Sequence, residues 1–315
     1  MINRNNCKGI WSGICLPWDE NLSLDAKRFE KDIDMICAAG VHGVYITGST
    51  GEWYALDNYE FRYLVDIFSD TMKKNDALAV VGCHDINTRD ALKKVEYVVS
   101  KGTIDGIQFA FPFWMQLNKR EQREYVREIC DTHKEMNFWH YNTMRSKVKL
   151  SVSDYSYFIE RHSNLVATKW ADCDPLDCLR LSFLDPAINC FVGESSLAYC
   201  MANGARGSCS AFVNGNPRLI LDLYELCVEE RWEEAVMLQK KVNTWVVKVV
   251  MPFFNKYEMM DPVIDKMIQY AGGYNPPDNV YTRKPYIPVS KEVLERFKEE
   301  TEQVFPEFIY TEEPI

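Results

Sequence analysis

The stretch Leu24-Asp-Ala-Lys-Arg-Phe-Glu-Lys-Asp-Ile-Asp-Met-Ile-Cys-Ala-Ala-Gly-Val-His-Gly-Val-Tyr-Ile-Thr47 joins a helix pattern to a short apolar run. The helix pattern extends to Ala39, and Gly40 follows it as a helix C-terminal glycine would. The run from Val44 to Thr47 is short and rich in residues that favour strands. The stretch therefore predicts a helix that leads directly into a buried strand.

This alternation of strand and helix continues along most of the chain. Strands separated by helical crossovers predict a parallel sheet, and eight units within about 210 residues favour a (β/α)₈ barrel over an open sheet. A doubly wound sheet is the main alternative, but no Gly-x-Gly-x-x-Gly follows the first run. The eight strand-like runs are Ile10–Leu16, Val44–Thr47, Ala79–Cys83, Gly106–Phe111, Phe138–Tyr141, Leu165–Trp170, Cys190–Val192 and Gly207–Ala211.

The chain after Pro217 shows only helix patterns, at Leu219–Glu229, Trp232–Val250 and Lys291–Val304. A charged helix is also expected from Lys119 to Met136 in the barrel part. We predict a barrel core over residues 1–216. Residues 217–315 are expected to form the final barrel helix and a C-terminal helical extension.

Composition limits the classes of function. The chain has 315 residues, of which 47% are hydrophobic, and its 46 acidic and 36 basic residues give a net charge of −10. This charge disfavours nucleic acid and anionic membranes as partners. No run approaches the ~18 apolar residues of a membrane span, and the N-terminus lacks an apolar signal core. We expect a cytoplasmic globular protein.

The eleven cysteines are scattered, odd in number and mostly within apolar runs, which predicts reduced thiols. Cys173 and Cys178 have four residues between them and no partner pair, unlike a usual zinc site. The five histidines form no spaced pair suited to a metal. The sequence therefore predicts no metal site. A Ser-His-Asp hydrolase is disfavoured because no Gly-x-Ser-x-Gly is present.

Lys169 ends the sixth strand-like run, Leu165–Trp170. Period-2 alternation predicts that Leu165, Ala167 and Lys169 share one face of the strand. Burial of the ammonium group would lower its pKa from ~10.4 and favour the neutral amine that attacks a ketone. The alternative is a lysine that reaches solvent or pairs with Asp172 or Asp174.

Two further strand ends carry candidate groups. Tyr141 ends the fifth run and could transfer a proton, although core tyrosines are common. Gly48-Ser-Thr-Gly-Glu52 follows the second run, and its glycines would let the backbone approach a carboxylate. An ordinary glycine-rich turn is the alternative. Similar turns follow the seventh and eighth runs, at Gly193–Ser196 and Gly207–Ser210.

These motifs together resemble the dihydrodipicolinate synthase and N-acetylneuraminate lyase superfamily, from about Gly9 to the helical tail. The resemblance implies a TIM barrel with a helical C-terminal extension, a homotetramer and class I aldolase chemistry that needs no cofactor. It also implies that Lys169 forms a Schiff base with pyruvate, Tyr141 shuttles protons, and Ser49 and Thr50 bind the pyruvate carboxylate. The motifs are Gly48–Glu52, Tyr141-Asn142, Lys169 and Gly204-Ala-Arg-Gly-x-x-Ser210.

The remaining residues that we expect to contact the substrate are Gly48, Gly193, Ser210, Trp114 and Arg145. Dihydrodipicolinate synthases carry a relay tyrosine after strand four, where this chain reads Phe111-Pro-Phe-Trp114. They also place an arginine where this chain has Ser146, with Arg145 one position early.

Sialic acid lyases carry an Asp-Glu pair where this chain has Ser195-Ser196. The Pro-x-Trp ending at Trp114, and Trp170 directly after the lysine, look more like the hydratase-aldolase branch of the superfamily. Trp53 lies beside another strand end. We therefore expect an aromatic or apolar aldehyde as the partner of pyruvate.

The predicted activity is a Schiff-base lyase that makes or cleaves a carbon-carbon bond at C3 of pyruvate or a related 2-oxo acid. The enzymatic alternatives are 4-hydroxy-tetrahydrodipicolinate synthase, N-acetylneuraminate lyase and a 2-keto-3-deoxy-sugar-acid aldolase or dehydratase. A barrel that has lost activity and serves as a binding or sensor protein is the non-enzymatic alternative.

Overall fold

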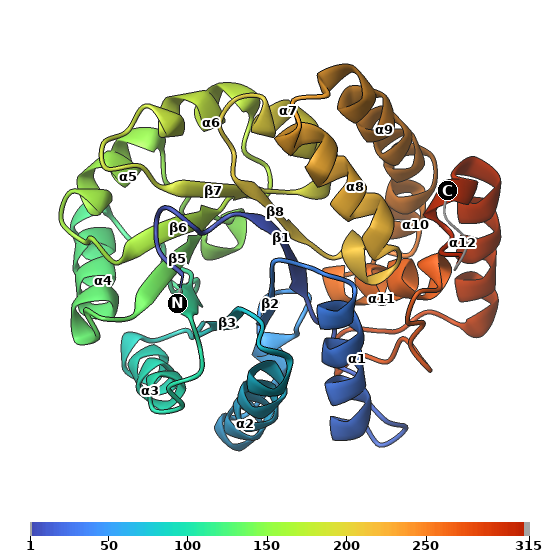
Figure 1. Ribbon diagram of the computed structural model, residues 1–315. Helices are drawn as coiled ribbons and strands as arrows, with labels where there is room; N and C mark the ends of the chain where they lie inside the picture. The colour runs from blue at the N-terminus through green and yellow to red at the C-terminus, as the bar shows by residue number, and fades with distance from the viewer. Residues whose placement is uncertain (1, 312–315) are drawn as a thin grey trace.

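The computed structural model describes residues 2–311, and within them eight parallel strands close into a barrel in sequence order. Figure 1 shows the helices arranged around the strands. The predicted (β/α)₈ barrel with additional C-terminal helices is thereby confirmed. The strands are β1 (Gly9–Gly13), β2 (Gly43–Ile46), β3 (Ala79–Gly82), β4 (Gly106–Phe109), β5 (Asn137–Tyr141), β6 (Leu165–Lys169), β7 (Asn189–Val192) and β8 (Gly207–Ser210).

Eight helices alternate with the strands, and several begin at a polar capping residue. Asp57 and Asn118 each form a capping box, which satisfies exposed backbone N–H groups at the start of α2 and α4. The expected helix from Lys119 ends at Thr132, four residues early. The barrel helices are α1 (Ala26–Ala38), α2 (Asn58–Asn75), α3 (Thr88–Val99), α4 (Lys119–Thr132), α5 (Val152–Ile159), α6 (Pro175–Ser182), α7 (Leu197–Met201) and α8 (Pro217–Val228).

The C-terminal extension is helical, as expected. The single helix predicted over Trp232–Val250 is instead α9, which continues through a π-helical segment, η5, into α10. A helix that the sequence patterns did not delimit, α11, follows at Asp261–Gly272. These elements are α9 (Trp232–Trp245), η5 (Val246–Val250), α10 (Met251–Lys256), α11 (Asp261–Gly272) and α12 (Lys291–Val304); short 3-10 helices are η1 (Trp53–Ala55), η2 (Met144–Ser146), η3 (Glu194–Ser196), η4 (Phe212–Asn214) and η6 (Pro306–Phe308).

Large aromatic side chains fill the barrel interior. Trp139 stacks on Phe191 with ring centroids 4.6 Å apart, and Trp11 meets Trp139 edge-on at 4.8 Å. Gly43 gives the Trp11 ring its space, because a Cβ there would lie 2.3 Å from that ring. The interior is therefore a packed core, and any ligand must bind above it at one end of the barrel.

The expected alternation along β6, with Leu165, Ala167 and Lys169 on one face and Val166, Thr168 and Trp170 on the other, is wrong at its first two residues. The pairing register with β5 shifts so that Phe138 faces Leu165 while Trp139 faces Ala167, which is an irregularity of the β-bulge type at Val166. Leu165 consequently packs in the outer core, whereas Ala167 joins the interior cluster with Val166. Regular alternation resumes after the bulge.

Helix α11 lies against the loop that follows β8. Its close approach requires glycine on both sides, because a Cβ on Gly272 would lie 2.3 Å from the backbone of Gly215. Figure 1 shows α11 beside α8, at the side of the barrel near α1. The C-terminal extension therefore reaches the barrel itself. The predicted boundary after residue 216 falls between η4 and α8, and the division into two parts stays a prediction.

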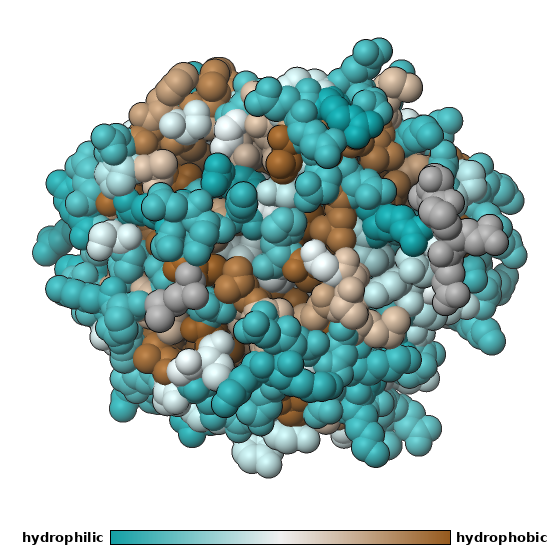
Figure 2. All heavy atoms as spheres, viewed as in Figure 1, coloured by the Kyte–Doolittle hydropathy of each residue, from teal (hydrophilic) through white to brown (hydrophobic). Residues whose placement is uncertain are grey.

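The surface in Figure 2 is mainly hydrophilic, with hydrophobic residues between the polar ones. This distribution fits a globular chain whose net charge is −10. None of the described helices is long and apolar enough to cross a membrane.

Candidate active site

Lys169 lies at the carboxyl end of β6, beside Tyr141 of β5 and Phe191 of β7 in the strand register. Its side chain is buried, with 7% exposure. The Nζ atom donates a hydrogen bond to the Tyr45 hydroxyl at 3.0 Å and lies 4.7 Å from the ring centroids of both Tyr45 and Tyr141. The amine is thus held between two phenols at the end of the barrel where active sites of this fold are found.

The alternative interpretation of Lys169 as a surface lysine is wrong. Asp172 pairs with Lys149 at 2.6 Å, and the Asp174 carboxylate accepts the N–H of Asp177 at the start of α6. Neither carboxylate neutralises Lys169. Its partners are aromatic hydroxyls inside the barrel.

The expected lowering of the Lys169 pKa is also corrected. Burial does disfavour the ammonium group, but the phenols of Tyr45 and Tyr141 outweigh that effect and hold the pKa of Lys169 above its ordinary value. The tyrosines therefore favour the ammonium form of Lys169. A proton must leave it before the nitrogen can attack a carbonyl carbon.

Tyr141 is buried at the end of β5, and its hydroxyl accepts a 3.5 Å hydrogen bond from Arg145 Nη1. The other end of the Arg145 guanidinium makes bonds of 2.8 and 2.7 Å to the two carboxylate oxygens of Asp261. Asp261 begins α11. An ion pair between the β5 loop and the C-terminal extension therefore fixes the group that orients Tyr141.

The glycine-rich turn after β2 is attached to α11 at two points. The Thr50 hydroxyl donates to Asp265 Oδ2 at 2.7 Å. The Glu52 carboxylate is fully buried and pairs with Lys266 Nζ at 2.7 Å. Ser49, which directly precedes Thr50, lines the cavity described below. The turn that was predicted to bind a carboxylate thus already meets one from the protein itself.

Asp265 is a site residue that the sequence did not reveal. Burial, followed by the nearby charges of Asp261 and Glu194, raises its pKa to about 8, against the opposing effects of Thr50 and Lys169. Asp265 is therefore a neutral carboxylic acid near pH 7. The one available signal was the pair Asp261 and Asp265 four residues apart, which occupies one face of a helix.

Three predicted binding residues have structural hydrogen bonds instead. The Gly193 N–H donates to Ala171 O at 3.0 Å, and the Ser210 hydroxyl accepts the N–H of Val213 at 3.2 Å. The Gly48 carbonyl accepts a long, 3.4 Å bond from the N–H of Trp53. Like Lys169 and Thr50, these three residues do not line the cavity beside Tyr141. Their contacts shape the strand ends that surround it.

Glu194, for which the resemblance offered no role, follows β7. Its Oε1 accepts the N–H groups of Ala211 at 2.5 Å and Phe212 at 3.2 Å. This carboxylate therefore fixes the loop after β8 and adds negative charge beside Asp265.

A cavity of about 190 Å³ opens beside Tyr141. Its wall is largely apolar with several aromatic side chains, and Ser49, Asp85, Arg145 and Asp261 add polar groups. Such a cavity suits a small molecule with an apolar body and a few polar contacts. Its lining residues are Ser49, Trp53, Tyr54, His84, Asp85, Ala110, Phe111, Phe113, Tyr141, Thr143, Arg145, Ser146, Met260, Asp261, Pro262 and Tyr286.

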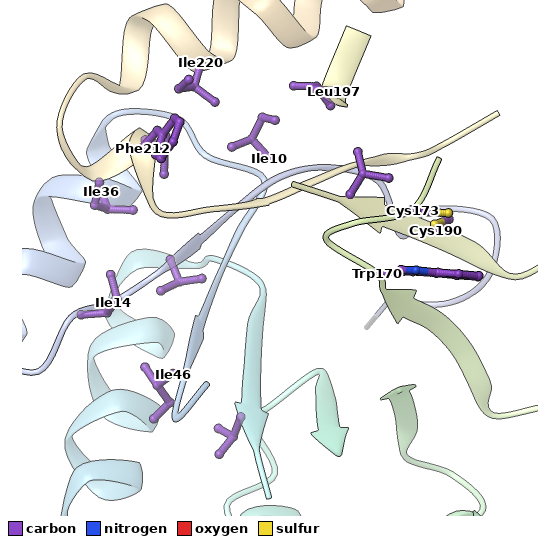
Figure 3. Close-up of a cluster of buried hydrophobic side chains, with 14 of the residues drawn as sticks. Ile10, Ile14, Ile36, Ile46, Trp170, Cys173, Cys190, Leu197, Phe212 and Ile220 are labelled. Carbon is purple, nitrogen blue, oxygen red and sulfur yellow. The ribbon is translucent and has the colours of Figure 1, made fainter. Parts of the chain in front are cut away.

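Two of the three tryptophans expected near the substrate lie elsewhere. Trp114 is 75% exposed and does not line the cavity. Trp170 points to the outer side of β6, where it packs in the hydrophobic core near Cys173 and Cys190, as Figure 3 shows. The reason is strand geometry, since the residue after an inward lysine faces outward. Trp53, in contrast, lines the cavity.

Two buried polar side chains, His84 of the cavity wall and Gln108, interact with each other. The ring nitrogens of His84 and the amide atoms of Gln108 make no hydrogen bond of good geometry within residues 2–311. Burial lowers the pKa of His84 to about 3, so the imidazole is neutral. Neutral donors and acceptors that are left unsatisfied in this way are suited to a polar group of a ligand.

The sequence is similar to those of known proteins along most of its length. The model of the dihydrodipicolinate synthetase family matches residues 6–304. N-acetylneuraminate lyase of Rhizobium meliloti is 26% identical over 239 residues, which cover 75% of this chain and 78% of that protein. 4-Hydroxy-tetrahydrodipicolinate synthase of Methanothrix thermoacetophila is 26% identical over 220 residues, which cover 69% and 72%.

Solved structures show the same fold. YagE, a prophage protein of E. coli K12 from the dihydrodipicolinic acid synthase family, has been solved in complex with pyruvate. It superposes with a TM-score of 0.83 at 17% sequence identity, covering 95% of this chain and 98% of that one.

Proposed function

The chain belongs to the dihydrodipicolinate synthetase family and is accordingly a carbon-carbon lyase, and we propose that it uses Lys169 to form an imine with pyruvate. The observation that carries the proposal is the placement of Lys169 Nζ between the phenols of Tyr45 and Tyr141. Tyr141 in turn lines a cavity of small-molecule size, so the amine lies one side chain away from that cavity. A primary amine on a rigid strand end can attack a ketone repeatedly in the same orientation.

The chemistry follows from the imine. Lys169 Nζ attacks C2 of pyruvate, and the ketone oxygen leaves as water. The positive imine then withdraws electrons, so that a proton leaves C3 and an enamine forms. C3 of the enamine attacks the carbonyl carbon of an aldehyde, and the new alkoxide takes up a proton. Water finally hydrolyses the imine and returns the amine of Lys169; cleavage runs through the same steps in reverse.

Tyr141 is the proposed proton carrier. Its ring centroid lies 4.7 Å from Lys169 Nζ, and its hydroxyl is held by Arg145 at the cavity wall. A group in this position can pass a proton between the amine, the leaving oxygen and the new alkoxide.

The carboxylate of the keto acid is proposed to bind at Ser49 and Thr50. Thr50 is bonded to Asp265, but the raised pKa of about 8 leaves that carboxyl group neutral near pH 7. A neutral acid does not repel an incoming carboxylate. The acidic neighbour is therefore compatible with an anionic substrate.

The aldehyde is proposed to be aromatic or otherwise apolar. Trp53, Phe111, Phe113, Tyr54 and Tyr286 supply the apolar wall of the cavity, and the Trp53 and Phe113 rings lie 6.2 Å apart in an edge-on arrangement. Contacts of this kind contribute about 0.5–1.5 kcal/mol beyond area burial, which corresponds to about two- to tenfold in selection. That Gly193, Ser210, Gly48 and Trp114 contact the substrate stays a prediction.

Reductive trapping tests the proposal. Borohydride added with pyruvate should convert the imine to a stable secondary amine on Lys169, located by peptide mapping. Lys169→Ala should abolish the adduct, whereas Lys147→Ala, at an exposed lysine of the neighbouring β5 loop, should retain it. No adduct, or an adduct that survives Lys169→Ala, would contradict the imine and favour a binding barrel.

A condensation assay then identifies the aldehyde. Pyruvate is offered with benzaldehyde-type acceptors, aspartate semialdehyde, N-acetylmannosamine and glyceraldehyde. Preference for an aromatic acceptor supports the proposal. Preference for one of the other three would assign the chain to the synthase, sialic acid lyase or sugar-acid activity while leaving the imine in place. We also propose that the chain is cytoplasmic and forms a homotetramer. Sedimentation of the purified chain would test the oligomeric state.

A further inference from the structure

Three buried thiols meet on the outer side of the barrel, away from Lys169. The Sγ atoms of Cys173, Cys178 and Cys190 all lie within 4.8 Å of one another, and the Cys173 and Cys178 sulfurs are 3.5 Å apart. Their exposures are 2%, 1% and 1%. Figure 3 shows the sulfurs of Cys173 and Cys190 side by side next to Trp170.

The cluster is assembled from separate elements. Cys173 lies in the loop after β6, Cys178 in α6 and Cys190 in β7. A fourth cysteine, Cys200 of α7, is fully buried, and its Sγ lies 3.5 Å from the carbonyl oxygen of Cys173. Cys200 also interacts with the Cys178 thiol, but its sulfur does not lie within 4.8 Å of all three others, so it would have to move toward an ion in order to bind it. The partners that Cys173 and Cys178 lack in sequence are thus supplied by the fold.

The distances between the three sulfur atoms fit a metal site better than they fit hydrophobic packing alone. Four sulfurs that bind one zinc ion tetrahedrally at about 2.3 Å lie about 3.8 Å from one another. The three thiols fall near this spacing before any ion is present, and thiols that only fill an apolar core have no reason to converge. Among residues 2–311 this is the one group of potential ligands that meets so closely.

We propose that Cys173, Cys178 and Cys190 bind a thiophilic metal ion, with Cys200 as the fourth ligand and Zn²⁺ as the reference ion. Each thiol that ligates releases its proton. With four protein ligands the site is closed and structural. It would join the loop that follows Lys169 to α6, β7 and α7.

The inference does not depend on the proposed aldolase activity, and its test does not use that activity. Protein purified with a reductant and without chelator is analysed for zinc by mass spectrometry. The metal is then removed and Co²⁺ is titrated in, because tetrahedral thiolate coordination gives intense ligand-field and charge-transfer absorption. We expect one equivalent of Co²⁺ with these bands, its displacement by Zn²⁺, and a higher melting temperature with Zn²⁺ than with a chelator.

Variants locate the site. Cys190→Ser and Cys178→Ser should each weaken Co²⁺ binding at least about tenfold and change the spectrum. Cys130→Ser is the matched control, because Cys130 of α4 is equally buried in the outer core and lies outside the cluster; it should bind like the parent chain. If a ligand variant fails to fold, the binding of Zn²⁺ and Co²⁺ by the parent chain still tests the proposal.

Three outcomes would overturn the proposal. The first is a reduced parent chain that binds neither Zn²⁺ nor Co²⁺. The second is cobalt absorption that is unchanged in both ligand variants. The third is an intact mass with a Cys173–Cys178 disulfide under the reducing conditions, which would assign the cluster to thiol oxidation.

Discussion

The Thr50 hydroxyl donates a 2.7 Å hydrogen bond to the carboxyl group of Asp265, although 215 residues separate the two in sequence. This bond joins the glycine-rich turn after β2 to the C-terminal extension at the position proposed for the substrate carboxylate. The extension therefore contributes a titratable group to the site, and its ionisation can be measured.

Asp265→Asn should remove a pH-dependent part of the stability. The folded-state pKa of about 8 exceeds the ordinary value of 3.8, so the unfolded chain loses this proton first as pH rises. The contribution is fully present below about pH 4 and is lost progressively up to about pH 8. The free energy of unfolding, measured with urea, should fall less between about pH 5 and about pH 9 in the variant than in the parent chain. If the free energy of unfolding changed equally with pH in the parent and the variant, the raised pKa of Asp265 would be contradicted.

Imine formation should accelerate as pH rises above neutrality. The raised pKa of Lys169 leaves little neutral amine near pH 7, and each increase in pH enlarges that fraction. The rate of borohydride trapping with pyruvate, measured over a pH series on the full chain, should therefore climb without levelling near pH 7. A plateau already reached below neutrality would show that Lys169 is deprotonated in the free enzyme.

Tyr141→Phe should separate proton transfer from imine formation. Loss of the hydroxyl is expected to lower kcat by about 10²-fold or more, because a general acid and base is removed. The pyruvate adduct on Lys169 should still be trapped. Tyr63→Phe, at an exposed position of α2, serves as the control and should leave kcat unchanged. A near-normal kcat in Tyr141→Phe would show that Tyr141 packs in the core and does not transfer protons.

The two tryptophans Trp53 and Trp114 should differ in their effect on the acceptor. Trp53→Ala removes a ring from the cavity wall and should lower kcat/KM for an aromatic aldehyde by about tenfold. Trp114→Ala changes a side chain that is 75% exposed and outside the cavity, and should have little effect. Equal losses in both variants, measured with the same aldehyde, would reject the assignment of the acceptor to this cavity.

Lys266→Met should destabilise the chain strongly. Lys266 and Glu52 are 3% and 0% exposed, so the substitution leaves a buried carboxylate without its cation. Breaking such a pair costs about 3–5 kcal/mol, and pairing the change with Glu52→Gln should recover part of the loss. Chemical denaturation of the single and double variants provides the measurement. A single variant within about 1 kcal/mol of the parent would show that Glu52 is not charged in the fold.

The barrel could be predicted because strand and helix patterns are local. Each of the eight runs overlaps an observed strand, and Lys169 and Tyr141 lie at the strand ends where the alternation placed them. The bulge at Val166 was not predictable, since it depends on pairing with β5 and leaves no pattern of its own. It changed the faces of Leu165 and Val166 without altering that of Lys169.

The rest of the site depends on contacts between distant segments. Asp261, Asp265 and Lys266 belong to α11, which no rule about strand ends would bring to the barrel mouth. The close approach of Gly215 and Gly272 places that helix, and neither glycine belongs to a recognisable motif. Cys190 likewise joins Cys173 and Cys178 only when β7 lies beside β6.

The stacked rings inside the barrel have an optical consequence. Trp11 of β1, Trp139 of β5 and Phe191 of β7 meet only when strands from opposite sides of the barrel have closed around them. Coupled indoles in a rigid, asymmetric setting give a circular dichroism signal in the near ultraviolet, whereas the surrounding helices absorb at shorter wavelengths. Barrel closure and helix formation in this chain therefore have separate spectroscopic reporters, so the order of the two events during refolding can be followed without any label.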